Sequence, residues 1–194
     1  MENRKNVKAL HLDSAGSWFR TEGTACEFPL KIMLNGKHLV TMLCSPGDPE
    51  ALAAGFLASE GIIKTKEEIR ELTLDGESGV VRIRTTENKT EDGKFFKERF
   101  LTTGCGRGVS FSSYDDTALK KKIFSDIHLT REDVLSLYHR FQENSDLYRE
   151  THAVHSAALC DTKEILVFTE DIGRHNAVDK IIGRCILEGI AFTD

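Results

Sequence analysis

Two apolar runs near the N-terminus flank the pair Asn35-Gly36 and predict a β-hairpin. The runs cover residues 29–34 and 37–43, and both positions of an Asn-Gly pair tolerate the positive φ angles that a tight hairpin turn needs. Upstream, residues 1–24 are polar and lack a clear period. We expect that segment to form a loose arm or an edge strand.

Further apolar runs of strand length recur along the chain. They cover residues 71–74, 79–84, 95–101, 154–159 and 164–169. The stretches between the first three are rich in Gly, Asp, Glu, Asn and Lys, which is typical of exposed turns. We expect each run to be a β-strand.

The first predicted helix begins at Asp48-Pro49 and stops at Gly61. Asp48 can cap the free amides of the first turn, Pro49 suits the first helical position, and Glu50 favours the positive end of the helix dipole. Gly61 is a typical residue for the position after a helix.

Two more helices are predicted in the second half of the chain, over about residues 130–143 and 172–187. Thr130 is the expected cap of the first of them. Its apolar face carries Val134, Leu135, Leu137, Tyr138 and Phe141. The last helix presents Val178, Ile181, Ile182, Cys185 and Ile186 on one side.

Strands mixed with helices, and no internal repeat, indicate a mixed α/β or α+β fold. A mild boundary falls near residues 112–118. We therefore expect a polar arm at 1–24, a β-rich subdomain with one helix at 25–112, and an α/β subdomain at 113–194.

The composition is that of a soluble globular protein, with 194 residues, 40% hydrophobic residues and 29% charged residues. The net charge of −5 and the lack of a basic patch argue against nucleic-acid binding, although one local site could still bind an anionic ligand. No apolar run approaches the roughly 20 residues of a membrane span, and the N-terminus lacks the apolar stretch of a secretory signal. We expect a cytoplasmic protein without membrane contact, whose five cysteines are thiols.

Cys105 stands in the loop Gly104-Cys105-Gly106-Arg107-Gly108, directly after a predicted strand. The glycines leave its sulfur accessible, and their backbone amides together with Arg107 favour the thiolate, which is the nucleophile. Such a thiolate could take sulfur from a persulfide donor and present it to an acceptor. The alternative is a turn that happens to contain a cysteine.

The other four cysteines lack such a context. Cys160 lies on a predicted strand and Cys185 on an apolar helix face, so both are expected to be inert core residues, and Cys26 and Cys44 show no special surroundings. No C-x-x-C pair accompanies Cys105, which argues against a dithiol oxidoreductase.

His152 and His155 lie three residues apart. On a helix they would share a face, and on a strand they would point to opposite sides. Either is a candidate general base or proton source for sulfur transfer, and a purely structural role is the alternative. No further ligands of a zinc site accompany them, so no metal is expected.

Polar residues gather again over residues 170–180. A helical projection places Arg174 and His175 near the apolar stripe, on the inward side of the first turn, with Asp179 one turn below His175. Asn176 and Lys180 then point away. Basic and polar groups at a helix N-terminus form an anion or phosphate site. The alternative is a solvent-exposed turn that Asp171 caps.

The stretch from Glu170 to Gly183, EDIGRHNAVDKIIG, closely resembles the signature of the FdhD/NarQ family, the formate dehydrogenase accessory sulfurtransferases. Other segments that resemble this family follow in the expected order at residues 27–36, 49–63, 104–106 and 152–159. The similarity covers about residues 24–190.

The resemblance implies a cytidine-deaminase-like three-layer α/β/α core without the deaminase zinc. It also implies that Cys105 receives sulfur as a persulfide from a cysteine desulfurase. The sulfur would pass to the bis-molybdopterin guanine dinucleotide cofactor of molybdenum before this cofactor enters the formate dehydrogenase apoprotein. The residues expected to contact the cofactor are Gly104, Gly106, Arg107, Asp171, Arg174, His175 and Asn176.

Two departures from the family pattern matter. Many members carry a second cysteine three residues after the first, where this chain has Gly108, so a relay with one cysteine fits better. The family also continues past Asp194 with a cofactor-binding stretch. Its absence is expected to uncover a hydrophobic face and to favour homodimerisation or aggregation.

Three hypotheses follow. In the leading one the protein is a sulfurtransferase with Cys105 as carrier, His155 or His152 managing protons, and Arg174 and His175 holding the cofactor. In the second it is a non-catalytic module that escorts the cofactor or the apoprotein. The third, a cysteine hydrolase, lacks an evident carboxylate to orient the histidine.

Overall fold

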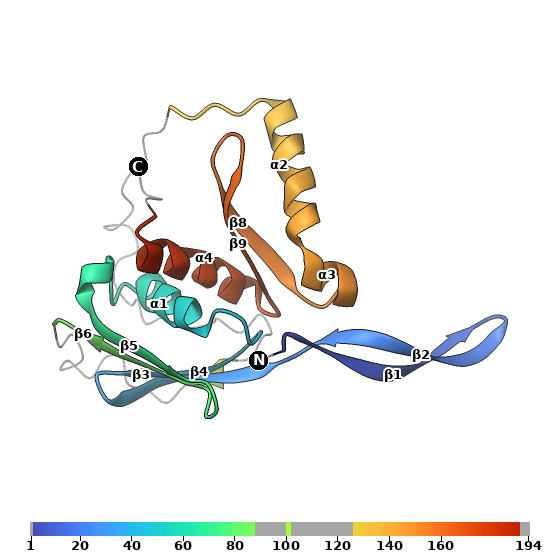
Figure 1. Cartoon of the computed structure of the whole chain (residues 1–194), viewed down its shortest axis with the longest axis horizontal. Coiled ribbons are helices and arrows are strands. Elements are labelled where there is room, and N and C mark those ends of the chain that lie inside the picture. The colour runs from blue at the N-terminus through green and yellow to red at the C-terminus, as the bar shows by residue number, and fades with distance from the viewer. Residues whose placement is uncertain (1, 88–99, 102–125, 191–194) are drawn as a thin grey trace.

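The computed structural model describes residues 2–87, 100–101 and 126–190 of the chain. Within them lie three sheets and four α-helices, arranged as a mixed α/β fold (Figure 1). The fold class predicted from the sequence is confirmed at this level. The predicted subdomain boundary at residues 112–118 lies outside the described residues, as does the loop that carries Cys105.

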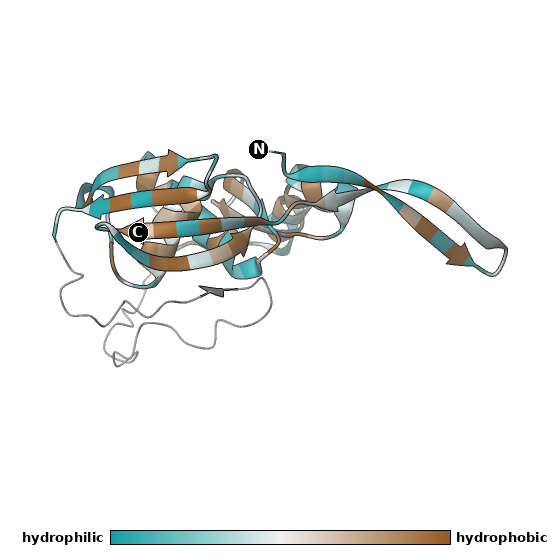
Figure 2. Ribbon diagram, turned by 90° about the horizontal axis from the view of Figure 1, so that it is seen from below, coloured by the Kyte–Doolittle hydropathy of each residue, from teal (hydrophilic) through white to brown (hydrophobic). Residues whose placement is uncertain are grey.

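The N-terminal segment forms a long antiparallel hairpin that projects from the body (Figures 1 and 2). Strands β1 (Arg4–Asp13) and β2 (Gly16–Ala25) pair along their whole length. At the turn, the Asp13 carboxylate accepts hydrogen bonds from the backbone amides of Ala15 and Gly16. This regular ribbon replaces the loose arm or edge strand that the sequence predicted.

The predicted Asn-Gly hairpin is confirmed. β3 (Phe28–Leu34) pairs with β4 (Lys37–Cys44), and both turn residues, Asn35 and Gly36, have positive φ. These strands form the centre of a five-stranded mixed sheet with the order β5-β6-β3-β4-β7.

The outer strands of this sheet come from the next part of the chain. β5 (Ile69–Asp75) follows a short 3-10 helix, η1 (Lys66–Glu68), and pairs antiparallel with β6 (Val80–Thr85). These strands confirm two of the predicted runs. Of the predicted strand at residues 95–101, only β7 (Phe100–Leu101) is described, running parallel to β4.

Helix α1 (Pro49–Ser59) covers one face of the five-stranded sheet and builds the main core with it. Leu52 and Phe56 from the helix are buried with Leu30, Ile32 and Val81 of the sheet. The helix was predicted with nearly these bounds, but its cap differs. Asp48 has a left-handed backbone and its side chain makes no capping hydrogen bond, so the start depends on Pro49 and on burial.

Helix α4 (Arg174–Glu188) crosses α1 at two glycines. A Cβ atom at Gly55 would lie 1.7 Å from the carbonyl oxygen of Asp179, and one at Gly183 would lie 1.8 Å from that of Ala51. Only residues without a side chain permit so close a backbone approach. The two helices therefore pack closely against each other.

The other side of α4 carries β8 (His155–Cys160) and β9 (Ile165–Asp171), an antiparallel pair that confirms two further predicted strands. Val167, Ile181 and Cys185 form a second, smaller core here. The helix pair α1–α4 thus lies between the five-stranded sheet, on which α1 packs, and the β8–β9 pair, on which α4 packs (Figure 1).

Helix α2 (Arg131–Asn144) lies beside β9 and leads into α3 (Asp146–Thr151). Thr130 and Asp133 form a complete capping box at its start, which confirms the predicted cap. Its predicted apolar face exists but is not buried: Val134, Leu135 and Tyr138 are exposed. None of the described helices is long and apolar enough to cross a bilayer.

Candidate functional site

A buried ion pair links the end of β9 to α4. Lys180 Nζ lies 2.7 Å from Asp171 Oδ2, and the two side chains are 2% and 0% exposed. Charges are buried in proteins only when they are paired and hydrogen-bonded, because their desolvation is costly. The pair therefore fixes the geometry of the turn between this strand and this helix.

Ser45, in the turn after β4, makes hydrogen bonds with both residues of the Asp171–Lys180 ion pair. The Ser45 amide donates to Asp171 Oδ2 at 2.9 Å, and the Ile172 amide donates to Ser45 Oγ at 3.1 Å. Lys180 Nζ also donates to the carbonyl oxygens of Ser45 and Glu170, both at 3.3 Å. The turn after β4 is thereby joined to the turn between β9 and α4, far away in the sequence.

Asn176 belongs to this interior cluster. Its Nδ2 donates to the carbonyl oxygen of Leu43 and to Asp171 Oδ1, both at 2.9 Å, and the Gly173 amide donates to Asp171 Oδ1 at 2.8 Å. The prediction that Asn176 and Lys180 point away from the interior is wrong. The alternative of a solvent-exposed turn capped by Asp171 is wrong as well, because Asp171 is buried, Gly173 occupies the cap position and no side chain caps the helix.

Arg174 and His175 are exposed at the first turn of α4, so the prediction that they face inward is also wrong. The helical projection assumed that α4 buries a single apolar stripe. The helix is instead covered on two sides, by α1 and by the β8–β9 pair. Its buried residues are Ala177, Asp179, Lys180, Ile181, Gly183, Cys185 and Ile186.

Asp179 is buried as well and does not lie in the exposed first turn. Its Oδ1 accepts a hydrogen bond of 2.6 Å from the hydroxyl of Ser59, at the end of α1. The stretch 170–183 thus divides into buried residues that hold the fold together and a short exposed part, with Arg174, His175 and Val178, that faces solvent.

Three of the four cysteines that the structure describes have raised thiol pKa values. Burial raises the pKa of the Cys44 thiol to about 12, with the Asp171 charge adding to the shift and Lys180 opposing it. Burial also raises the pKa of Cys160 and of Cys185, and neighbouring acidic residues contribute. These thiols are mostly protonated at neutral pH and are poor nucleophiles.

His152 and His155 lie on different elements, so neither sequence alternative holds. His152 follows α3 in a left-handed conformation, with φ of 51°, and its ring packs edge-on against Tyr148 at 5.4 Å between centroids. His155 is exposed and is the first residue of β8, paired with Asp171 across the sheet. The segment between them makes the turn from helix to strand.

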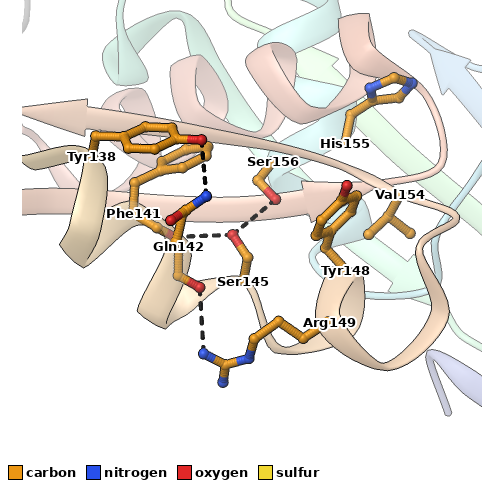
Figure 3. Close-up of a pocket in the computed structure, with 9 residues that line it drawn as sticks. All are labelled: Tyr138, Phe141, Gln142, Ser145, Tyr148, Arg149, Val154, His155 and Ser156. Carbon is orange, nitrogen blue, oxygen red and sulfur yellow. Dashed lines mark hydrogen bonds between the residues drawn. The ribbon is translucent and has the colours of Figure 1, made fainter.

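His155 lines a groove of about 490 Å³ between α2, α3 and the start of β8 (Figure 3). Tyr138 and Phe141 stand at one end of this groove, and Tyr148 and His155 stand at the other. The remaining lining residues are Gln142, Ser145, Arg149, Val154 and Ser156. Aromatic walls with a few polar groups are typical of small-molecule sites.

The floor of the groove is held by hydrogen bonds. The Ser145 hydroxyl donates to the carbonyl oxygen of Phe141 at 2.9 Å and lies 3.2 Å from Ser156 Oγ. Glu170 accepts from the amides of Leu147 and Tyr148, at 3.1 and 2.9 Å, and so caps α3. Sequence reasoning picked out His155 but missed the groove, since Tyr138 and Phe141 fit an ordinary core face.

A second hollow, of about 560 Å³, lies where the N-terminal hairpin joins the body. Its lining includes Cys26 at the base of the hairpin, Ala153 from the segment between the two histidines, and Ile172 just before α4. Residues 152–155 therefore run between the groove and this hollow.

The predicted loop residues Gly104, Cys105, Gly106 and Arg107 lie outside the described residues. Within the described part of the chain, no group of three or more His, Cys, Asp or Glu side chains is arranged to hold a metal ion.

Comparison with known proteins identifies the family. Residues 25–194 match the FdhD/NarQ family. The chain belongs to this family. Among relatives called sulfur carrier protein FdhD, the one from Bacillus subtilis (strain 168) is 40% identical over 168 residues, which are 87% of this chain and 64% of the relative.

A second FdhD relative, from Staphylococcus aureus (strain MRSA252), is 36% identical over 90% of this chain and 66% of its own length. The chain therefore spans about two-thirds of the length of these FdhD proteins. The fold resembles the crystal structure of a candidate formate dehydrogenase accessory protein from Desulfotalea psychrophila, with a TM-score of 0.73 and 27% identity. That match covers 96% of this chain and 70% of the other.

Proposed function

We propose that this FdhD/NarQ chain is a sulfur carrier for formate dehydrogenase maturation. It would take sulfur from a cysteine desulfurase, hold it on Cys105, and pass it to the bis-molybdopterin guanine dinucleotide cofactor, which is its cargo. The observation that carries the proposal is the family match over residues 25–194, together with FdhD relatives such as the one from Bacillus subtilis, which is 40% identical. A cytoplasmic location and a deaminase-like three-layer core belong to the same proposal.

The proposed first step is an attack by the Cys105 thiolate on the outer sulfur of a persulfide on the desulfurase. A new sulfur–sulfur bond forms on Cys105, and the desulfurase cysteine leaves as a thiolate that takes up a proton. Release of the sulfur at the sulfide level then requires two electrons from a thiol reductant. Glycines and Arg107 around Cys105 favour the thiolate, whereas burial raises the pKa of Cys44, Cys160 and Cys185.

His155 is the better candidate for moving the protons of these steps. It is exposed at the edge of the groove, whereas His152 packs its ring against Tyr148. A neutral imidazole can accept the thiol proton and return it to the leaving thiolate.

Arg174 and His175 are proposed to contact the phosphates of the cargo. Both side chains are exposed at the start of α4, where the helix dipole adds partial positive charge. Asp171 and Asn176, also predicted to bind the cofactor, are held in internal hydrogen bonds, so their proposed role is to position this turn.

Complementation tests the carrier role against the escort role. Cells that lack their own FdhD protein would receive the native chain, Cys105→Ala or Cys26→Ala, and formate dehydrogenase activity would be measured. The proposal expects activity with the native chain and with Cys26→Ala, and none with Cys105→Ala. Full activity with Cys105→Ala would instead favour the non-catalytic escort.

Binding of GDP, measured by calorimetry, tests the proposed cargo contact. Arg174→Ala should weaken binding by about tenfold, which is the loss of one phosphate contact of about 1.4 kcal/mol. Arg184→Ala is the matched control, because this arginine lies later on α4 and pairs with Glu188. Equal affinities for both variants would refute the assignment of Arg174.

A further inference from the structure

The second hollow, at the base of the hairpin that β1 and β2 form, has the size of a ligand site. Its volume of about 560 Å³ is within the usual range for small-molecule pockets. The base of the hairpin supplies one wall, with Lys5, Thr24 and the residues that follow Thr24. Ala153 and Ile172 form the opposite, apolar wall. A ligand in this hollow would therefore be recognised mainly from the hairpin side.

Two opposite charges line the hollow without pairing. Lys5 and Glu27 are both exposed, and among the described residues neither makes an ion pair or a side-chain hydrogen bond. Lys5 is directly paired with Thr24 across the hairpin, and Glu27 follows Thr24 by three residues. Because an extended chain rises roughly 3.3 Å per residue, the two charges are about 10 Å apart. A ligand with an anionic and a cationic end at this separation satisfies both.

Between these two charges, β2 presents a backbone edge. The Cys26 amide donates to the Asn3 carbonyl oxygen at 2.9 Å, on the side of β1. Successive residues of an antiparallel strand direct their hydrogen-bonding groups to opposite sides, so the amide and carbonyl of Ala25 point away from β1. Ala25 also lines the hollow, and no hydrogen bond within the described part of the chain occupies its outward groups. Such an edge is a template for one more strand.

We propose that this hollow binds a short peptide of about three residues with free ends, which adds to the edge of β2. The middle residue of the peptide pairs with Ala25 through two backbone hydrogen bonds. Its terminal carboxylate lies near Lys5 and its terminal ammonium near Glu27. The peptide then runs antiparallel to β2, and three extended residues span the roughly 10 Å between the two charges.

The free ends set both the selectivity and the strength of binding. An internal segment of a protein chain lacks the two terminal charges, so the hollow selects small peptides. Exposed ion pairs contribute little in water, and the hollow is open to solvent, so we expect a dissociation constant of roughly 0.1–1 mM. The site does not involve Cys105, so this inference stands or falls separately from the sulfur-carrier proposal.

Saturation-transfer NMR on the full chain tests the proposal, with trialanine as the probe. The peptide with free ends should bind. The same peptide with an acetylated N-terminus and an amidated C-terminus should bind at least about tenfold more weakly, because both charges are lost. Trialanine that is N-methylated at its middle residue should also bind about tenfold more weakly, since it cannot donate a hydrogen bond to the Ala25 carbonyl.

Protein variants locate the site. Lys5→Glu should weaken trialanine binding at least about tenfold with an unchanged thermal midpoint, because Lys5 is exposed and lies outside both cores. Lys8→Glu is the matched control, since Lys8 lies on the opposite face of β1, against the Phe19 ring, and should bind as the native chain does. Ala153→Phe should abolish binding by filling the hollow from its other wall.

Three results would overturn the proposal. The first is that free-ended trialanine does not bind to the native chain below about 5 mM. The second is that the peptide with blocked ends, or the N-methylated peptide, binds as well as free trialanine. The third is that Lys5→Glu and Lys8→Glu change the affinity equally.

Discussion

Replacing Lys180 by methionine removes one half of the ion pair that joins β4, β9 and α4. Methionine has nearly the length of lysine, so the cavity left behind is small, and the change acts mainly on charge. Asp171 then keeps a buried negative charge with three remaining donors: the amides of Ser45 and Gly173 and the side chain of Asn176.

Removing one partner of a buried pair costs about 3–5 kcal/mol, because the other charge is left without compensation. The three donors that remain on Asp171 place Lys180→Met at the lower end, at about 3 kcal/mol. For a chain of this size, the thermal midpoint should fall by about 6–12 °C.

Urea unfolding followed by circular dichroism gives the free energy, and a thermal scan gives the midpoint. Arg184→Met is the control, since it breaks the partly exposed pair with Glu188 and should cost less than about 1 kcal/mol. The double variant Asp171→Asn/Lys180→Met should be less destabilised than the sum of the single variants. If Lys180→Met costs no more than Arg184→Met, the pair does not hold the turn as argued.

Three further changes have defined outcomes. Gly55→Ala should lower the free energy of unfolding by more than about 2 kcal/mol, because the added methyl group meets the α4 backbone, whereas Gly76→Ala, which meets nothing within 4 Å, should stay within about 0.5 kcal/mol in the same urea titration. Cys44 has a pKa raised from 9.0 to about 12, so the folded state keeps a proton that the unfolded state loses. The unfolding free energy of the native chain should therefore fall relative to Cys44→Ala as pH rises above 9.0, by about 1.4 kcal/mol per pH unit, and parallel curves would contradict this. Thr130→Ala removes the cap of α2 and should cost about 1 kcal/mol, with faster amide exchange confined to the first turn of that helix; unchanged exchange there would refute the role of the cap.

Turns and helix caps that depend on a few adjacent residues could be predicted from the sequence. The Asn35-Gly36 turn and the Thr130 cap each depend on a few adjacent residues, and both appear where the sequence placed them. The N-terminal hairpin was missed because its pairing depends on register across two strands whose apolar residues are sparse.

The orientation of α4 could not be predicted from one apolar stripe. Its buried surface includes Asp179 and Lys180, whose partners, Ser59 and Asp171, lie on other elements. A helical projection assigns such charged residues to the solvent side of the helix. With Asp179 and Lys180 placed there, Arg174 and His175 were wrongly predicted to face the interior. Charged residues on a helix that is covered on two sides are read correctly only when their partners are known.

The histidine pair shows the same limit. Spacing alone offered a shared helix face or opposite strand faces, but the chain leaves α3 at His152 and enters β8 at His155. The left-handed backbone at His152 makes this turn, and neither a glycine nor an asparagine marks it in the sequence.

The proposed carrier role depends on whether sulfur becomes bound to Cys105. Mass spectrometry of the chain after incubation with a cysteine desulfurase and cysteine, followed by peptide mapping, tests this directly. The account predicts an adduct of one sulfur atom on the peptide that contains Cys105, absent in Cys105→Ala and present in Cys160→Ala. An unmodified chain, or an adduct that persists in Cys105→Ala, would contradict it.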